Sequence, residues 1–505
     1  MKFIYTSIQG RILLIAIFFF LFSDISLISA ENYFKISPGI KKAYSVINNL
    51  KLKEGQKILD SLKRTEPGNM MVYHIEDYID FYKIFINEDY NEFVQLEKNR
   101  DYRLSKIATG DKKSPYYRFC EAEIKLHWAL GRLKFEEYFT TLRELKSAHD
   151  LLTENSRLYP DFAINKKSLS AIHALVGTFP DTYKNLLSLF SGLSGSIKIG
   201  AKEAEEAINF TKKKECLFKD EIYTIAAFIA LHLENNKEKA WNLILSAKLK
   251  TSVSPLACFV VSNIASKTGR NDEAVSILIK RPVSKDRLPF YYLDYMLGKS
   301  LLYRLDTDAN IHLLKFIQNF RGINYIKDAY LKLAWYELII KKNENNYRKY
   351  IEKTIKEGKT IVDEDKTALK EASLSGSPNP DLLKSRLLFD GSYFTKAYKY
   401  LEINKSKFTA SNKDYPEYNY RMGRILQMLN NNFDALTRFN NAIQIGKKND
   451  FYFACSSALQ SGIIYENMND KKNAKKYYNI CLNIEPQEYK NSLHQKAKAG
   501  LLRIK

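Results

Sequence analysis

Two copies of one residue pattern stand in tandem between residues 416 and 486, and this repetition constrains the fold more than any other feature. Each copy starts at a glycine and has a bulky residue at +3, alanine at +12, an aromatic residue at +16 and a small residue at +19. The copies are Gly423, Leu426, Ala435, Phe439 and Ala442, then Gly462, Tyr465, Ala474, Tyr478 and Cys481. Positions three or four apart share one helix face, so the spacing predicts a pair of helices packed around the glycine. One pair cannot bury its apolar face alone, which favours several pairs in series.

Partial copies of the same spacing start at Ala43, Phe228, Ser262, Gly298 and Ser385. With its glycine, alanine and aromatic positions, the pattern resembles the tetratricopeptide repeat (TPR). The resemblance implies an all-α fold, an α-solenoid of antiparallel helical hairpins, and we count about nine such units. Only 20 glycines and 12 prolines among 505 residues agree with a mostly helical chain.

The pattern predicts six segments along the chain. They are a signal peptide over 1–30, degenerate helical repeats over 31–158, a non-repeat central helical segment over 159–215, TPR-like hairpins over 216–370, a loop over 371–381, and C-terminal repeats with a capping helix over 382–505. The N-terminal assignment depends on Lys2 and Arg11, the apolar run 12–22, and the small residue Ala30. We therefore expect cleavage after Ala30 and a periplasmic, secreted or cell-surface bacterial protein, with no integral membrane domain afterwards. An uncleaved N-terminal anchor is the alternative.

The central segment breaks the repeat with a turn over 177–181 and a run over 191–200 that holds three glycines. That run contains neither GxGxxG nor GxxxxGK[ST], so a helix–loop–helix connection is favoured over a phosphate-binding loop. Residues 165–208 faintly resemble, in their glycine and apolar placement, the tetratricopeptide-repeat-39 and Iml2-type outer-membrane proteins of mitochondria. That resemblance implies a divergent TPR array without enzyme activity.

No residue pattern indicates catalysis, a cofactor or a metal site. The seven histidines include no HExxH pair, no GxSxG motif is present, and the five cysteines form no CxxC pair. His127 and the cysteines sit in apolar helical windows and are expected to be core residues. The net charge is +22, but basic residues are mixed with acidic ones along nearly every helix, so no nucleic-acid partner is predicted.

The TPR resemblance implies that the first helix of each hairpin lines a concave surface. Carried over by position, the surface residues are Arg386 and Phe389, then Tyr420, Arg424 and Gln427, then Leu459, Ile463 and Glu466. Arg386 and Arg424 suit bidentate contacts with a carboxylate of a partner. Ordinary solvated side chains are the alternative interpretation of all eight.

The predicted function is therefore a non-catalytic scaffold that binds a protein or peptide partner in a concave groove. One alternative is a glycan-binding surface protein similar to the SusD family, although no lipid-anchoring cysteine follows residue 30. The other is a hydrolase on a helical scaffold, which needs two carboxylates across a cleft. Neither the partner nor the oligomeric state follows from the sequence.

Overall fold

The computed structural model describes residues 32–177, 192–447 and 451–504. The predicted signal peptide lies outside these ranges, as does nearly all of the predicted turn over 177–181. The described residues form an all-α solenoid of antiparallel, TPR-like hairpins, and their only extended pairing is one isolated bridge between Tyr33 and Asn69. None of the helices in these ranges combines the length and apolarity that a bilayer crossing requires.

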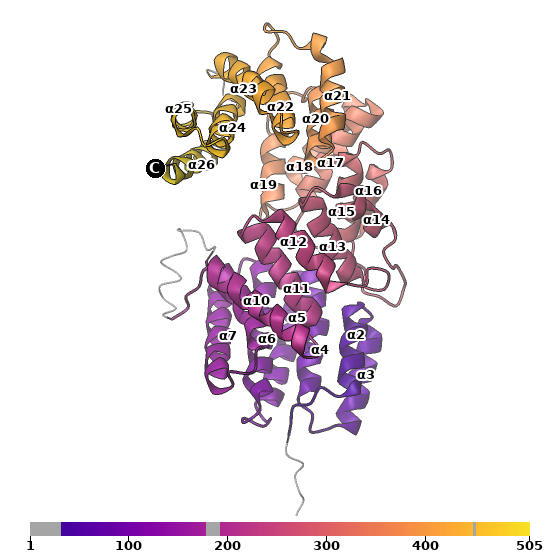
Figure 1. Ribbon diagram of the computed structural model, residues 1–505. Helices are drawn as coiled ribbons and strands as arrows, with labels where there is room; N and C mark the ends of the chain where they lie inside the picture. Colours follow the sequence, from indigo (N-terminus) through magenta and orange to yellow (C-terminus); the bar gives the residue numbers. More distant parts are fainter. Residues whose placement is uncertain (1–31, 178–191, 448–450, 505) are drawn as a thin grey trace, which may run out of the picture.

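Three hairpins form the N-terminal part, at the base of Figure 1. Their helices are α2 (Pro38–Asn48), α3 (Leu52–Thr65), α4 (Met71–Asn87), α5 (Tyr90–Ile107), α6 (Pro115–Lys134) and α7 (Tyr138–Leu158). Two of these starts follow directly from the sequence, because Ser37 and Ser114 accept a hydrogen bond from a first-turn amide and a proline follows each serine.

The central and middle helices continue the array. They are α8 (Asn165–Val176), α10 (Ile197–Lys213), α11 (Lys219–Phe228), α12 (Lys237–Ala247), α13 (Pro255–Lys267), α14 (Asn271–Ile279), α15 (Tyr292–Tyr303), α16 (Ala309–Asn319), α17 (Ile326–Tyr336), α18 (Glu344–Lys356) and α19 (Asp363–Ala372). In the central segment, α8 and α10 pack against each other without the repeat spacing. A Cβ built on Gly200 of α10 would lie 2.5 Å from the backbone oxygen of Ser170 in α8. The two helices therefore touch backbone to backbone.

The C-terminal helices are α20 (Pro380–Asp390), α21 (Phe394–Ile403), α22 (Tyr415–Met428), α23 (Asn432–Gly446), α24 (Phe453–Asn467), α25 (Lys471–Leu482) and α26 (Lys490–Arg503). The repeat spacing has a direct structural cause here. A Cβ on Gly423 would lie 2.6 Å from the ring of Phe439, and a Cβ on Gly462 would lie 2.6 Å from the ring of Tyr478. Each glycine therefore leaves room for the aromatic ring of the second helix.

The solenoid doubles back, so that the N-terminal hairpins contact the middle ones. The Ser254 hydroxyl donates to the Asn48 carbonyl oxygen at 2.8 Å, and the Leu288 amide donates to the Leu50 carbonyl oxygen at 2.8 Å. Further along, the Asn324 side-chain amide donates to Glu88 at 2.8 Å. These contacts enclose space between helices that are far apart in the sequence.

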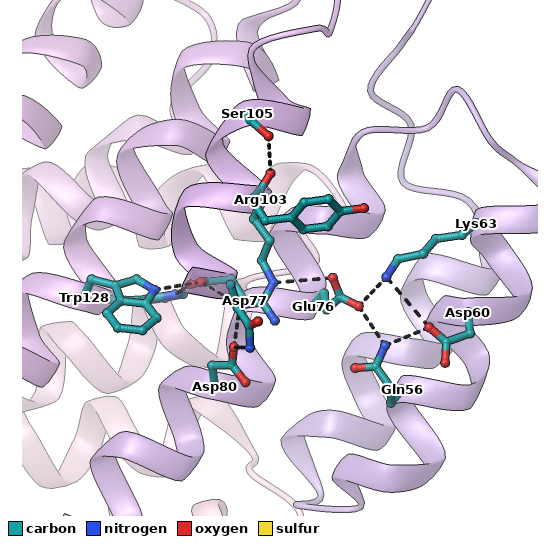
Figure 2. Close-up of polar contacts among 12 residues, drawn as sticks. Gln56, Asp60, Lys63, Glu76, Asp77, Asp80, Arg103, Ser105 and Trp128 are labelled. Atoms are coloured by element: carbon teal, nitrogen blue, oxygen red, sulfur yellow. Dashed lines mark hydrogen bonds and ion pairs between the residues drawn. The ribbon is translucent and has the colours of Figure 1, made fainter. Parts of the chain in front are cut away.

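A buried charge network lies inside the N-terminal hairpins (Figure 2). Arg103 donates to Asp80 at 2.7 Å and lies 3.5 Å from Asp77. Asp77 also accepts from the indole nitrogen of Trp128 at 3.0 Å and lies 2.9 Å from Nδ1 of His127. The prediction that His127 is a core residue is confirmed, since it is buried and bonded within this network. Each charge here has a partner, as buried charges require.

The cysteines are mostly core residues, as predicted: four are buried and Cys216 is half-buried. Their positions include one pair that the sequence did not indicate. Cys455 of α24 and Cys481 of α25 have Sγ atoms 3.6 Å apart. The last hairpin therefore carries two thiols in contact across its interface.

Candidate functional site

The C-terminal helices curve in the upper part of Figure 1, and the residue before α26 contacts α19. The Lys370 ammonium of α19 lies 4.3 Å from the ring centroid of Tyr489, which precedes α26. Inside this turn are two adjoining cavities of about 430 and 330 Å³, which we call the C-terminal cavity pair. Residues that line both are Arg386, Arg421, Tyr452, Ser456, Leu493 and Lys496. Sites of this size hold small molecules or a few side chains of a partner.

Five of the eight residues predicted for the concave surface line the smaller cavity: Arg386, Phe389, Tyr420, Arg424 and Leu459. Three do not line either cavity of the pair: Gln427, Ile463 and Glu466. Glu466 is occupied elsewhere, because it pairs with Arg503 at 2.6 Å and accepts from the Tyr478 hydroxyl. Ile463 packs on the apolar core of the last hairpin.

Arg386 is not available for a partner carboxylate, which corrects the interpretation from its repeat position. Its guanidinium donates to both oxygens of Glu371 in α19, at 2.8 and 2.7 Å, and lies 4.8 Å from the ring centroid of Trp335. Burial acts to raise the pKa of Glu371, but the charge and hydrogen bonds of Arg386 outweigh it, so the pKa is lowered. The pair is a structural clamp between α19 and α20.

The surroundings of Arg424 differ from those of Arg386. Within the part of the chain that the structure describes, its side chain makes no hydrogen bond or ion pair, and its Nε is buried without a partner. The guanidinium lies 5.4 Å from the ring centroid of Phe389. Its neighbour Arg421, by contrast, forms an ion pair with Glu417. A half-buried guanidinium over an aromatic ring with an unpaired N–H is suited to accept an external anion.

Aromatic side chains form one wall of the cavity pair. Ring centroids of Tyr420 and Tyr452 are 5.6 Å apart, and those of Tyr452 and Tyr489 are 5.1 Å apart. The Ser456 hydroxyl donates to the Tyr420 hydroxyl oxygen at 3.3 Å. Sequence reasoning missed Tyr452 and Tyr489 because both precede a helix and therefore fall outside the repeat offsets. The run Phe451–Phe453 was the signal that could have found the first of them.

Charge in the smaller cavity is mainly positive. Its lining includes Arg386, Arg421, Arg424 and Lys496 against one carboxylate, Asp390. Burial raises the pKa of Asp390, and burial likewise raises the pKa of Glu488 in the larger cavity. The described residues contain no group of three or more His, Cys, Asp or Glu side chains placed to hold a metal ion. The smaller cavity is therefore lined mainly by basic side chains and aromatic rings, whereas the larger one also contains carboxylates such as Glu417 and Glu488.

The fold and this site define an α-solenoid with an aromatic cavity pair that contains one guanidinium, that of Arg424, without an ion pair among the described residues. No protein-family model matches the chain. No curated protein matches it either. Similar solved structures include the human IFIT1 dimer with PPP-AAAA, at 14% identity over 80% of this chain and 82% of that chain, with a TM-score of 0.37. The human IFIT1 dimer with m7Gppp-AAAA has 13% identity over 81% of this chain and 90% of that chain, with a TM-score of 0.38.

A chain of the Naa15/Naa10 complex bound to HypK-THB is also similar, at 12% identity over 92% of this chain and 65% of that chain. Its TM-score is 0.23. At this level of similarity, no ligand or partner of these proteins can be assigned to this chain.

Proposed function

We propose that this chain is an exported, non-catalytic scaffold whose C-terminal cavity pair binds an acidic segment of a partner protein. The observation that carries the proposal is Arg424, a half-buried guanidinium without an ion pair that faces a cavity lined by Tyr420 and Leu459. A glutamate or aspartate side chain of the partner supplies the missing anion. The aromatic wall supplies flat apolar contact beside it.

A peptide suits this site better than an isolated anion. The two cavities adjoin, since Arg386, Tyr452 and four further residues line both, so an extended chain can place one side chain in each. Arg386 and Arg421 already have carboxylate partners, so one free guanidinium remains to select one acidic side chain.

Fluorescence anisotropy with two pools of labelled, randomised peptides tests this proposal. One pool has a fixed central glutamate, and the other has glutamine there and is otherwise identical. The wild-type chain is expected to bind the glutamate pool about tenfold more tightly, because a charged hydrogen-bonded pair is gained. The variant Arg424→Met, which keeps a long apolar side chain without the charge, is expected to lose this preference.

Arg348→Met is the matched control, since Arg348 of α18 is largely exposed and lines neither cavity. It should keep the glutamate preference. Equal binding of both pools by the wild-type chain would contradict the proposal. Tighter binding of a single-stranded RNA of equal length, with the same dependence on Arg424, would replace the protein partner by a nucleic acid.

Export makes a separate prediction about the two contacting thiols. In an oxidising compartment a disulfide oxidant takes two electrons from Cys455 and Cys481, two protons leave, and an Sγ–Sγ bond joins α24 to α25. Chain expressed with residues 1–30 and recovered from a bacterial periplasm is expected to begin at Glu31. Alkylation after unfolding should label three cysteines, compared with all five after reduction. An intact N-terminus would refute cleavage, and five labelled cysteines without reduction would refute the cross-link.

A further inference from the structure

A second cavity, of about 370 Å³, lies where the N-terminal hairpins fold back on the middle of the solenoid. We call it the central cavity. It is lined by residues of α4, α6, α11, α13, α15 and α19 and of the segments before α15 and α17, so no single hairpin contains it. It shares no lining residue with the C-terminal cavity pair. Whatever it binds is therefore independent of the function proposed above.

Aromatic rings make up most of the apolar lining. The ring centroid of Phe259 lies 5.6 Å from that of Phe290 and 6.0 Å from that of Tyr292. The ring of Tyr292 in turn lies 4.7 Å from that of Tyr325. Phe228 of α11 adds a further ring. These flat surfaces suit an aromatic body of a ligand, which gains offset or edge contacts in addition to burial.

Two ammonium groups of the lining make no direct contact with a carboxylate in the described structure. Among the described residues, neither Lys267 nor Lys299 forms a hydrogen bond or ion pair, and Lys299 Nζ lies 4.9 Å from the ring centroid of Tyr295. Lys134, the third lysine, is already paired with Glu88 at 2.6 Å. The remaining carboxylate, Glu364, is also unpaired, which leaves one net positive charge for a ligand to neutralise.

An uncharged polar group of the cavity also lacks a partner. The side-chain oxygen Oδ1 of Asn263 in α13 is buried and accepts no hydrogen bond from the described residues. Buried polar atoms are nearly always satisfied, so an orphan in a cavity wall indicates a missing donor. A hydroxyl or N–H group on a ligand supplies that donor.

The protonation of Lys299 agrees with this geometry. Burial lowers the pKa of Lys299 to about 8, although the Asp328 carboxylate acts in the opposite direction. An anion beside the ammonium would offset this effect of burial and favour the charged form.

We infer that the central cavity binds a small molecule with an aromatic body, one anionic head group and a hydrogen-bond donor. Lys299 and Lys267 contact the anionic head, the rings of Phe259 and Tyr292 contact the body, and Asn263 accepts from the donor. An organic cation would also suit a cage of rings. The two unpaired ammonium groups oppose a cation, because they outnumber the one free carboxylate.

The fluorescent probe anilinonaphthalene sulfonate tests this inference, since it combines an aromatic body, an N–H group and one anion. The full-length chain is expected to bind it at one saturable site. Lys299→Met is expected to weaken binding about tenfold or more, because a charged contact in a desolvated site is lost. Lys299→Arg keeps the charge and should retain most of the affinity.

Two controls distinguish binding in the central cavity from misfolding of the variant and from binding in the C-terminal cavity pair. The uncharged analogue phenylnaphthylamine should bind the wild-type chain and Lys299→Met alike, which shows that the variant is folded and that its aromatic walls are intact. Arg424→Met should bind the sulfonate as the wild type does. Displacement of the bound sulfonate by aromatic carboxylates, compared with its displacement by aromatic phosphates, then identifies the preferred head group. Unchanged sulfonate affinity in both Lys299→Met and Lys267→Met, or loss of binding in Arg424→Met, would overturn the inference.

Discussion

Replacing Lys167 by methionine is expected to destabilise the N-terminal hairpins by about 3–5 kcal/mol, the usual cost of breaking a buried ion pair from one side. Lys167 of α8 is 3% exposed, and its ammonium donates to Glu123 of α6 and, at 2.6 Å, to Glu221 of α11. Burial opposes the charge of Lys167, but these two carboxylates outweigh it and raise its pKa. Methionine would leave both carboxylates without their cation.

The loss should depend on pH in a defined direction. Burial alone would raise the pKa of Glu221, but in the wild type Lys167 lowers it below its usual value. In the Lys167→Met variant the orphaned Glu221 carboxylate binds a proton more readily in the folded state than in the unfolded state. The free energy of unfolding of the variant should therefore fall as pH rises from about 4.5, and the deficit should be larger at pH 8 than at pH 5.

Urea unfolding followed by circular dichroism measures this deficit. Lys41→Met is the matched control, because Lys41 pairs with Glu215 on the surface and is expected to contribute less than about 1 kcal/mol. The double variant Lys167→Met with Glu123→Gln should recover part of the loss. An unfolding midpoint of Lys167→Met equal to that of Lys41→Met would show that the network does not hold these helices together.

Replacing Gly200 by valine is expected to have the second largest effect, because it forces α8 and α10 apart. A Cβ at this position would lie 2.5 Å from the Ser170 backbone oxygen and 2.9 Å from the Ala174 backbone nitrogen, and backbone atoms cannot move aside singly. Overpacking costs about 1–3 kcal/mol, and valine adds two further methyl groups. Alanine should cost less, since it regains about 1 kcal/mol of helix propensity over glycine.

Gly423→Ala is the comparison for the alanine variant. Its Cβ would meet the Phe439 ring at 2.6 Å, and a side chain has more freedom to turn away than a backbone. Thermal unfolding should therefore rank Gly200→Val below Gly200→Ala, and Gly200→Ala below Gly423→Ala. Hydrogen exchange should locate the first loss in α8 and α10. The reverse ranking would mean that the central helices are not in backbone contact.

The hairpin architecture was predictable because its determinants are local. Gly423 and Phe439 stand 16 residues apart and meet across one interface, so their spacing alone predicts two packed helices. The central break was predictable for the same reason, since the spacing stops there. The contact between α8 and α10 at Gly200 could not be predicted, because a glycine in a glycine-rich segment does not indicate which helix packs against it.

The candidate site was predictable only in part. Repeat position places Arg386 and Arg424 on the same surface, and the structure indeed brings both to one cavity. Their roles differ because Glu371, on the preceding helix α19, neutralises Arg386 and does not reach Arg424. The central cavity had no sequence signal at all, since its walls come from helices between α4 and α19 that are far apart in the sequence.

The sequence by itself determined that the helices of this chain form hairpins. It also determined at which glycines an aromatic ring of the second helix packs, because both residues belong to one hairpin. Only the tertiary structure decided which charged side chains form ion pairs or hydrogen bonds and which remain unpaired. Glu88 meets a partner 236 residues away, Arg386 meets Glu371, and Arg424 and Lys299 meet none in the described structure. Free charge is a property of the assembled interior, because it depends on every group that folding brings within hydrogen-bond distance.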